Sequence, residues 1–220
     1  MLRVIRVLAF TSLCMGVSPA QADDRMFDPE AASRNASLAL KWQDMQRRIA
    51  DDEARVAACR AETWMCSDDE RRLIAIADMG HARDGRARIG EVNRAVNLAI
   101  RPVSDERRFG VADQWSAPLE TMSAGEGDCE DYAILKWLAL KEAGIGGDDL
   151  RLVIVRERAV RSSHAILAVR LDGRWLLLDN RSFALVDLDQ THYRVLAALG
   201  PDAEKAQIVA IGVGSAPGVM

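Results

Sequence analysis

The chain has 220 residues, of which 49% are hydrophobic and 28% are charged, and its formal net charge is −4. This balance is typical of a single globular domain with a sizeable core. The slight excess of acidic residues gives no reason to expect nucleic acid as a partner.

The first 22 residues have the pattern of a secretory signal peptide. Arg3 and Arg6 precede an apolar core over residues 7–17 that is too short to span a bilayer, and residues 20–22 read A-Q-A, a cleavage site. No later stretch is long and apolar enough to cross a membrane. We therefore expect an exported, soluble mature protein made of one domain, residues 23–220.

Apolar spacing predicts three helices in the first half of the chain, over residues 31–59, 67–79 and 89–100. Ser67 and Glu70 form a capping box at the start of the second helix. Residues 80–88 are expected to be a basic loop. Asn93 and Asn97, on the polar face of the third helix, are expected to be solvated or capping groups.

The mature chain contains Cys59, Cys66 and Cys129, so in an oxidising compartment two cysteines pair and one is left over. On one continuous helix Cys59 and Cys66 would lie roughly 10 Å apart, too far for a disulfide. The helix start at Ser67 implies a bend between them. We expect this pair to be bridged, contributing about 2.5 kcal/mol through loop closure, and Cys129 to be the free thiol.

A long connection over residues 103–126, a length that is often functional, leads to a cysteine at the start of a helix. Three features predict this helix: Asp128 as its N-cap, acidic residues in the first turn, and an apolar run over residues 132–140. Because the run is apolar nearly all round, we expect the helix to be buried. A thiol at a helix N-terminus has its thiolate stabilised by the dipole and the free N–H groups. The simpler alternative is a buried cysteine in an acid-capped helix.

After this helix the apolar period changes from 3.6 to 2. It predicts strands over 150–156, 164–171 and 174–179 and weaker ones over 184–188, 193–198 and 207–213. Helices first and strands second favour an α+β fold with an antiparallel sheet, in which the helical part covers about 31–101 and the catalytic core about 103–213.

Asp172-Gly173 predicts a two-residue hairpin that sets Leu171 opposite Arg174. In that register His164 and Asp179 are diagonal neighbours on one face, within reach of a side-chain hydrogen bond. The same face carries four apolar residues that we expect to pack on the central helix: Ile166, Ala168, Trp175 and Leu177.

Cys129, His164 and Asp179 therefore form a candidate nucleophilic triad. Its logic is a thiol, a base within reach, and a carboxylate that fixes the orientation and tautomer of the imidazole. Taken alone, each residue favours a structural interpretation: His164 as a satisfied sheet histidine and Asp179 as a strand-end cap.

Four segments resemble the bacterial transglutaminase-like cysteine peptidases, in particular the LapG-type periplasmic proteases: W-S-A-P at 115–118, G-D-C-E-D-Y-A at 127–133, S-H-A at 163–165 and L-D-N at 178–180. The resemblance extends over about residues 85–190. It implies a papain/transglutaminase-like core with the triad named above, and calcium bound beside the nucleophile by Asp128, Glu130 and Asp131.

The same resemblance implies a periplasmic endopeptidase that cuts the N-terminal region of a large surface adhesin beside paired alanines, and so controls adhesin release and biofilm formation. The implied regulator is the periplasmic domain of an inner-membrane cyclic-di-GMP receptor.

Charge gives an independent reason to expect a cation beside Cys129. A carboxylate about 6 Å from the thiolate costs roughly 2.8 kcal/mol at an effective dielectric near 20. That raises the thiol pKa by about two units for each of Asp128 and Glu130, more than the helix dipole offsets. Calcium would cancel the repulsion; otherwise the two carboxylates simply cap the helix and turn towards water.

Two alternatives stay open. The same triad supports acyl transfer to an amine, as in transglutaminases or peptidoglycan remodelling, or the protein is a calcium-binding adaptor without catalysis. For the endopeptidase and for the acyl-transfer enzyme alike, the Cys129 backbone N–H is one expected oxyanion donor, and Gln114 or Trp115 is the second.

The leader and the odd cysteine predict the covalent state of the exported protein. It should begin at Asp23, with Cys59 and Cys66 bridged and Cys129 reduced. Intact-mass measurement with and without reductant tests this, and an intramolecular disulfide that includes Cys129 in active protein would contradict it.

Overall fold

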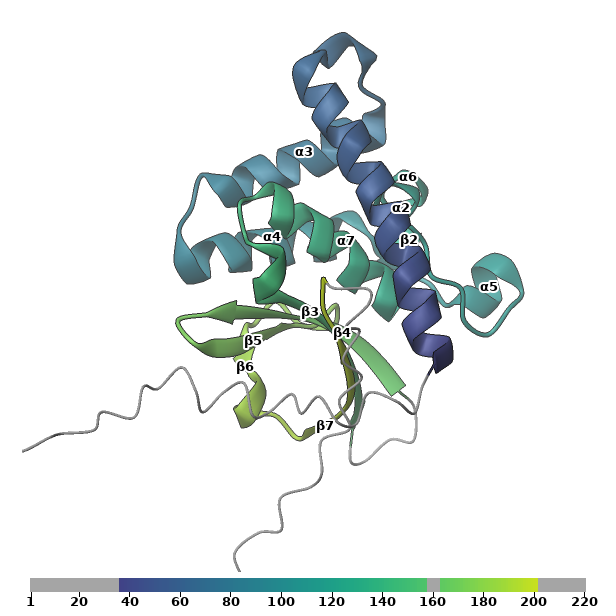
Figure 1. The fold of residues 1–220 in the computed structure, drawn as a ribbon, viewed down its shortest axis with the longest axis vertical. Coiled ribbons are helices and arrows are strands. Elements are labelled where there is room, and N and C mark those ends of the chain that lie inside the picture. Colours follow the sequence, from purple (N-terminus) through teal and green to yellow (C-terminus); the bar gives the residue numbers. More distant parts are fainter. Residues whose placement is uncertain (1–35, 158–162, 202–220) are drawn as a thin grey trace, which may run out of the picture.

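The computed structural model describes residues 36–157 and 163–201. The expected leader, its cleavage site and the expected strand over 207–213 lie outside these residues. In the described part, a layer of helices lies on one face of a curved sheet (Figure 1). None of the described helices is both long and apolar enough to span a membrane.

Six described helices form the first layer: α2 (Ala36–Ala61), α3 (Asp68–His81), α4 (Gly85–Ala99), α5 (Asp105–Phe109), α6 (Pro118–Ala124) and α7 (Cys129–Glu142). The central one is α7, which contacts α3, α4, α6 and the sheet. Its residues from Glu130 to Leu140 are all buried. The expectation of a buried helix that begins at the cysteine is therefore confirmed, and its apolar circumference is the reason.

Five described strands form the second layer: β3 (Leu150–Glu157), β4 (Ser163–Leu171), β5 (Arg174–Leu178), β6 (Val186–Asp187) and β7 (Tyr193–Leu199). They are antiparallel in the order β6-β5-β4-β3-β7. The hairpin register is confirmed, since Leu171 pairs with Arg174. Asp172 and Gly173 have φ values of 51° and 78°, the left-handed pair that a two-residue hairpin needs.

Short elements complete the described chain: β1 (Arg101–Pro102) pairs in parallel with β2 (Glu126–Gly127), and three 3₁₀ turns cover Thr63–Met65, Gly147–Asp149 and Leu188–Gln190. A disulfide joins Cys59 to Cys66, whose Cα atoms lie 4.8 Å apart because α2 ends between them and the chain turns. Ser67 caps α3 through a capping box with Glu70.

One packing prediction is wrong. The sheet face with Ile166, Ala168, Trp175 and Leu177 does not pack on the central helix but forms a second cluster. The face that joins α7 carries the alternate residues: Ala165, Leu167, Val169, Leu176 and Leu178. Both faces of this sheet are buried and both carry apolar residues. The alternation of side chains along the strands therefore does not tell which face meets the helix.

Two segments expected to be loops contain helices. The basic loop over 80–88 shrinks to residues 82–84, because α3 runs on to His81 and α4 begins at Gly85. The connection over 103–126 contains α5 and α6, the latter opened by Pro118 in the first turn. Helices of one or two turns are too short for apolar periodicity to reveal.

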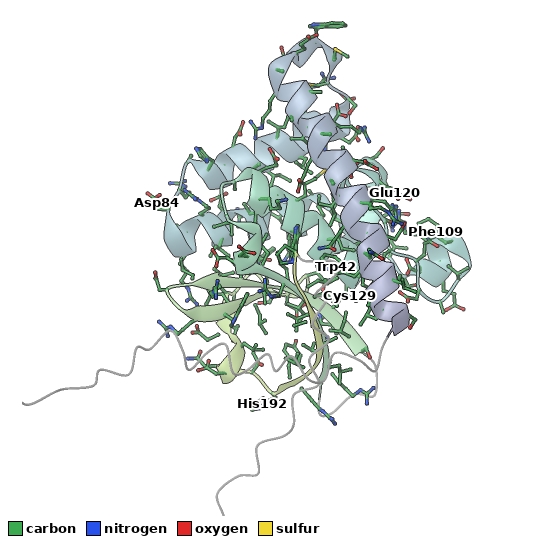
Figure 2. All side chains as sticks on the ribbon, viewed as in Figure 1. Trp42, Asp84, Phe109, Glu120, Cys129 and His192 are labelled. Atoms are coloured by element: carbon green, nitrogen blue, oxygen red, sulfur yellow. A yellow bond between two sulfur atoms is a disulfide. The ribbon has the colours of Figure 1, made fainter. Side chains whose placement is uncertain are left out.

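Trp42 anchors α2 on this core. It is fully buried, its ring meets those of Trp115 and Trp137 edge-on, and its Nε1 donates to the Gly200 carbonyl over 2.7 Å. Trp42 therefore ties α2 to the residue that follows β7. In Figures 1 and 2, α2 runs across the helical layer, and its first turns line the cavity that Cys129 also borders.

Candidate active site

The turn into α7 is tight at Gly127. A Cβ atom on this residue would lie 2.7 Å from the Asp131 side chain, a separation that real Cβ atoms do not tolerate. Asp131 accepts hydrogen bonds from the Ser116 backbone N–H (2.8 Å) and from Arg108 Nη1 (2.9 Å). Asp131 thus ties the start of α7 to the connection that carries Trp115.

The sheet brings the predicted histidine and aspartate together. His164 lies near the start of β4, Asp179 directly follows β5, and His164 Nε2 lies 2.9 Å from Asp179 Oδ1. With the Nε2 proton donated to Asp179, the ring keeps its lone pair on Nδ1, the state that a general base requires.

Three further groups hold the Asp179 carboxylate. It accepts the Arg181 backbone N–H and the Tyr193 hydroxyl, each over 2.9 Å, and lies 3.4 Å from the Arg181 guanidinium. Burial opposes the charged form, but the hydrogen bonds from His164, Arg181 and Tyr193 outweigh it and hold the pKa of Asp179 well below its usual range. The carboxylate is therefore ionised at neutral pH.

Asn93 and Asn97 have a part in this arrangement that the sequence did not reveal. Asn93 is fully buried, so its expected solvated position is wrong. Its Nδ2 donates to the Ser182 carbonyl, and Asn97 Nδ2 donates to the carbonyls of Asp179 and Ser182. Two side-chain amides one helical turn apart on α4 thus hold the loop after Asp179. The sequence shows their spacing, but it does not show which backbone carbonyls they bind.

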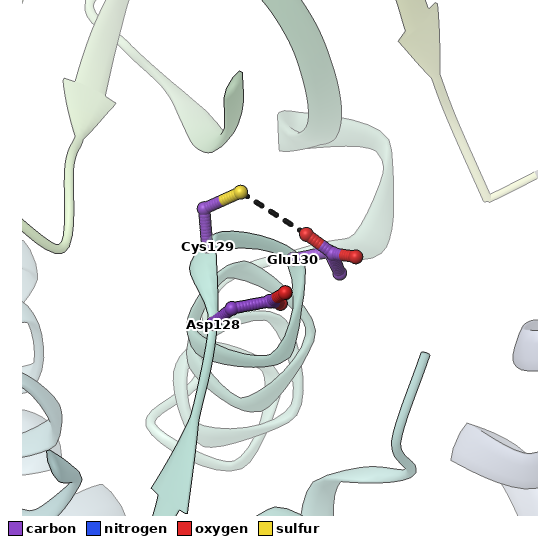
Figure 3. Close-up of side chains that lie close together, drawn as sticks. All are labelled: Asp128, Cys129 and Glu130. Carbon is purple, nitrogen blue, oxygen red and sulfur yellow. Dashed lines mark hydrogen bonds between the residues drawn. The ribbon is translucent and has the colours of Figure 1, made fainter. Parts of the chain in front are cut away.

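Cys129 and His164 border one cavity of about 580 Å³, whose other walls include α2 and Trp115. The Cys129 thiol donates to Glu130 Oε2 over 3.0 Å (Figure 3), and its Sγ accepts the Ala165 backbone N–H over 3.4 Å. Burial first, and the Glu130 charge second, raise the pKa of the Cys129 thiol far above its usual range. The raised pKa agrees in direction with the prediction from the sequence, but burial, and not only the acidic neighbours, causes it.

The acidic cluster beside Cys129 is larger than the sequence indicated. Asp105 and Asp113, from the connection before α7, each place a carboxylate oxygen within 4.8 Å of one on Glu130, and Asp105 does so with Asp128 and Asp131. Burial, followed by the Asp128 charge, raises the pKa of Glu130 to about 9. Burial likewise raises the pKa of Asp128.

These carboxylates fit a divalent cation. Asp105 Oδ1 and Asp128 Oδ1 are buried oxygens without a hydrogen-bond partner among the described residues. Clustered carboxylate oxygens are the donors that calcium prefers. Asp131 differs, because Ser116 and Arg108 already occupy both of its oxygens.

The two expected oxyanion residues separate in the structure. Trp115 borders the cavity, with its Nε1 donating to Asp113 Oδ1 over 3.1 Å and the Lys41 ammonium 4.6 Å from its ring centroid. The Gln114 backbone N–H is held by Asp105, and Gln114 is not among the residues that border the cavity. Trp115 is therefore the better placed of the two.

Comparison with known proteins identifies a family and a fold for the chain. A family model described as bacterial transglutaminase-like cysteine proteinase matches residues 53–212. The calcium-bound structure of LapG from Legionella pneumophila matches with a TM-score of 0.56 at 20% identity, over 66% of this chain and 83% of that one. An EGTA-treated LapG structure matches with a TM-score of 0.54 at 20% identity, over 66% and 80%.

At this identity the likeness to LapG shows the fold, and it confirms the expected α+β, transglutaminase-like core. No relative was found among curated proteins.

The buried Glu130 predicts how the metal-free protein responds to pH. A carboxyl group with a raised pKa binds more protons in the folded than in the unfolded state between about pH 4.5 and about 9, so stability falls as pH rises through this window. Urea unfolding in EGTA across that range should show the fall. Glu130→Gln should flatten it, whereas exposed Glu62→Gln should not; equal slopes for all three proteins would contradict the assignment.

Proposed function

The chain belongs to the family of bacterial transglutaminase-like cysteine proteinases, and from this premise we propose that it is a calcium-dependent periplasmic endopeptidase that cuts the N-terminal region of a large cell-surface adhesin. The observation that carries the proposal is the His164–Asp179 pair at the cavity into which Cys129 opens. The cavity volume is in the range usual for ligand sites, roughly 300–1,000 Å³.

In this proposal Cys129, His164 and Asp179 are the catalytic triad. His164 takes the thiol proton, and the Cys129 sulfur attacks the scissile carbonyl. The imidazolium, held by Asp179, then protonates the leaving amine as the C–N bond breaks. Water, deprotonated by His164, cleaves the thioester and regenerates the thiol. The Cys129 backbone N–H, with Trp115 beside it, is the proposed oxyanion site.

Calcium would be held by Asp128 and Glu130, with Asp105 and Asp113 as further oxygen donors. Asp131 would not bind the ion but would fix the turn through its hydrogen bonds with Ser116 and Arg108. When bound, it supplies the positive charge that offsets the repulsion among these carboxylates. Without that charge Glu130 keeps a proton and accepts from the thiol, which leaves Cys129 protonated and turned to Glu130. This arrangement supports a requirement for the metal in addition to the resemblance.

The adhesin substrate and the regulator, the periplasmic domain of an inner-membrane cyclic-di-GMP receptor, are proposed from the resemblance of the active-site segments. The exported location follows the expected leader. The role in adhesin release and biofilm control rests on the same ground.

The triad is tested with candidate adhesin N-terminal fragments from the same genome. Cys129→Ala and His164→Ala should each abolish cleavage, and Asp179→Asn should lower it by several orders of magnitude because the imidazole loses its orientation. His192→Ala is the matched control, since His192 lies far from Cys129 (Figure 2) and should be neutral. Near-normal cleavage by His164→Ala would place the base elsewhere, and incorporation of a labelled primary amine in place of cleavage would favour acyl transfer.

Metal removal tests the calcium requirement. EGTA should stop cleavage and calcium should restore it better than magnesium, because a cluster of several carboxylates suits the larger ion. Asp128→Ala and Glu130→Ala should resemble the chelated protein, and Asp51→Ala, an exposed position on α2, should not. Full cleavage by metal-free protein in excess EGTA would falsify the requirement while leaving the triad standing.

A further inference from the structure

A lysine is completely buried in the middle of α7. Among the described residues, Lys136 is the only lysine or arginine with no exposed surface. Among the described residues, no carboxylate lies within ion-pair distance of its ammonium. Its hydrogen-bond partner is a backbone carbonyl, that of Leu178, over 3.1 Å.

The position of that carbonyl matters, because Leu178 ends β5 and the next residue is Asp179. Lys136 holds the backbone on one side of Asp179, and Asn97 from α4 holds the Asp179 carbonyl on the other side over 3.0 Å. The charged and titratable groups around the carboxylate come from four elements: His164 on β4, Arg181 in the following loop, Tyr193 on β7, and Lys136 on α7.

Lys136 also lies on the same side of α7 as the nucleophile Cys129. It follows Cys129 by seven residues on one continuous helix, which is nearly two full turns, so both residues lie on the same side of α7. The helix that begins with the thiol therefore contacts, two turns further on, the strand end that carries the carboxylate.

A charge at this position costs stability. Burial lowers the pKa of Lys136 to about 7, and the Asp179 charge offsets only part of that effect. Replacing a buried charge by an apolar side chain of similar volume is often neutral or stabilising. A methionine would fill the same space on a helix that is otherwise apolar, so stability alone does not explain a lysine.

We propose that Lys136 is a positioning residue of the active site, which fixes the Leu178 carbonyl and thereby the backbone from which the Asp179 carboxylate holds His164. The inference rests on the proposed function, because it assumes that the pair activates Cys129. Lys136 itself does not border the cavity and touches no reacting atom.

The test measures thiol activation directly, without a substrate. The rate of Cys129 alkylation by iodoacetamide is followed by mass spectrometry in calcium-containing buffer, together with the thermal midpoint. Lys136→Met should keep or raise the thermal midpoint. It should slow alkylation by roughly 10- to 100-fold, the loss typical when a residue that orients a metal ligand through a hydrogen bond is removed. Lys136→Gln, which keeps a side-chain N–H donor but loses the charge, should fall in between.

Two comparisons separate positioning from a merely structural role. In the Asp179→Asn background, Lys136→Met should have little further effect, because the carboxylate through which it acts is gone. Lys141→Met, at a partly exposed position five residues further along the same helix, should alkylate at the wild-type rate.

An alkylation rate within twofold of wild type in folded Lys136→Met would overturn the inference. So would failure of both Lys136 variants to fold, since the lysine would then be a structural requirement. The proposed function fails separately, if His164→Ala alkylates as fast as wild type. If His164→Ala is slow and Lys136→Met is not, only the role of Lys136 is lost.

Discussion

The structure depends on one constraint: α7 is buried on all sides, so Glu130 and Asp131 in its first turn are buried, and Asp128 and Cys129 are half-buried beside them. Burial limits the hydration of these carboxylates, and the structure compensates for it in two ways. Asp131 is paired with Arg108 and a backbone N–H. Glu130 instead holds a proton and accepts from the thiol. The thiol and the acidic cluster are therefore electrostatically coupled, and whatever neutralises the cluster changes the state of Cys129.

The two layers of the fold have separate tasks around the cavity. The helical layer supplies the thiol and the clustered carboxylates, whereas the sheet supplies the imidazole and the carboxylate that orients it. Contacts between the layers set their relative position. Ala165 N–H reaches the Cys129 sulfur, Lys136 reaches the end of β5, and Asn97 reaches the loop beyond it. The precision of the site thus depends on polar contacts that cross an otherwise apolar interface.

The elements that the sequence alone predicted share one property, which is that short-range chemistry determines them. The capping box at Ser67 and the helix start at Asp128 depend on residues within one turn of each other. The two-residue turn at Asp172 set the register, and the register alone placed His164 beside Asp179, before any tertiary contact was known. The family resemblance rests on the same local segments.

Only the tertiary structure decided which sheet face meets α7, because both faces are apolar and period 2 is the same on each. It also decided that Asp105 and Asp113 join the acidic cluster, since they come from a connection with no periodicity of its own. The roles of Asn97 and Lys136 are hidden for a related reason: each binds a backbone carbonyl more than 40 positions away. Because every residue has a backbone carbonyl, no pattern of side chains in the sequence predicts which carbonyl a given residue will bind.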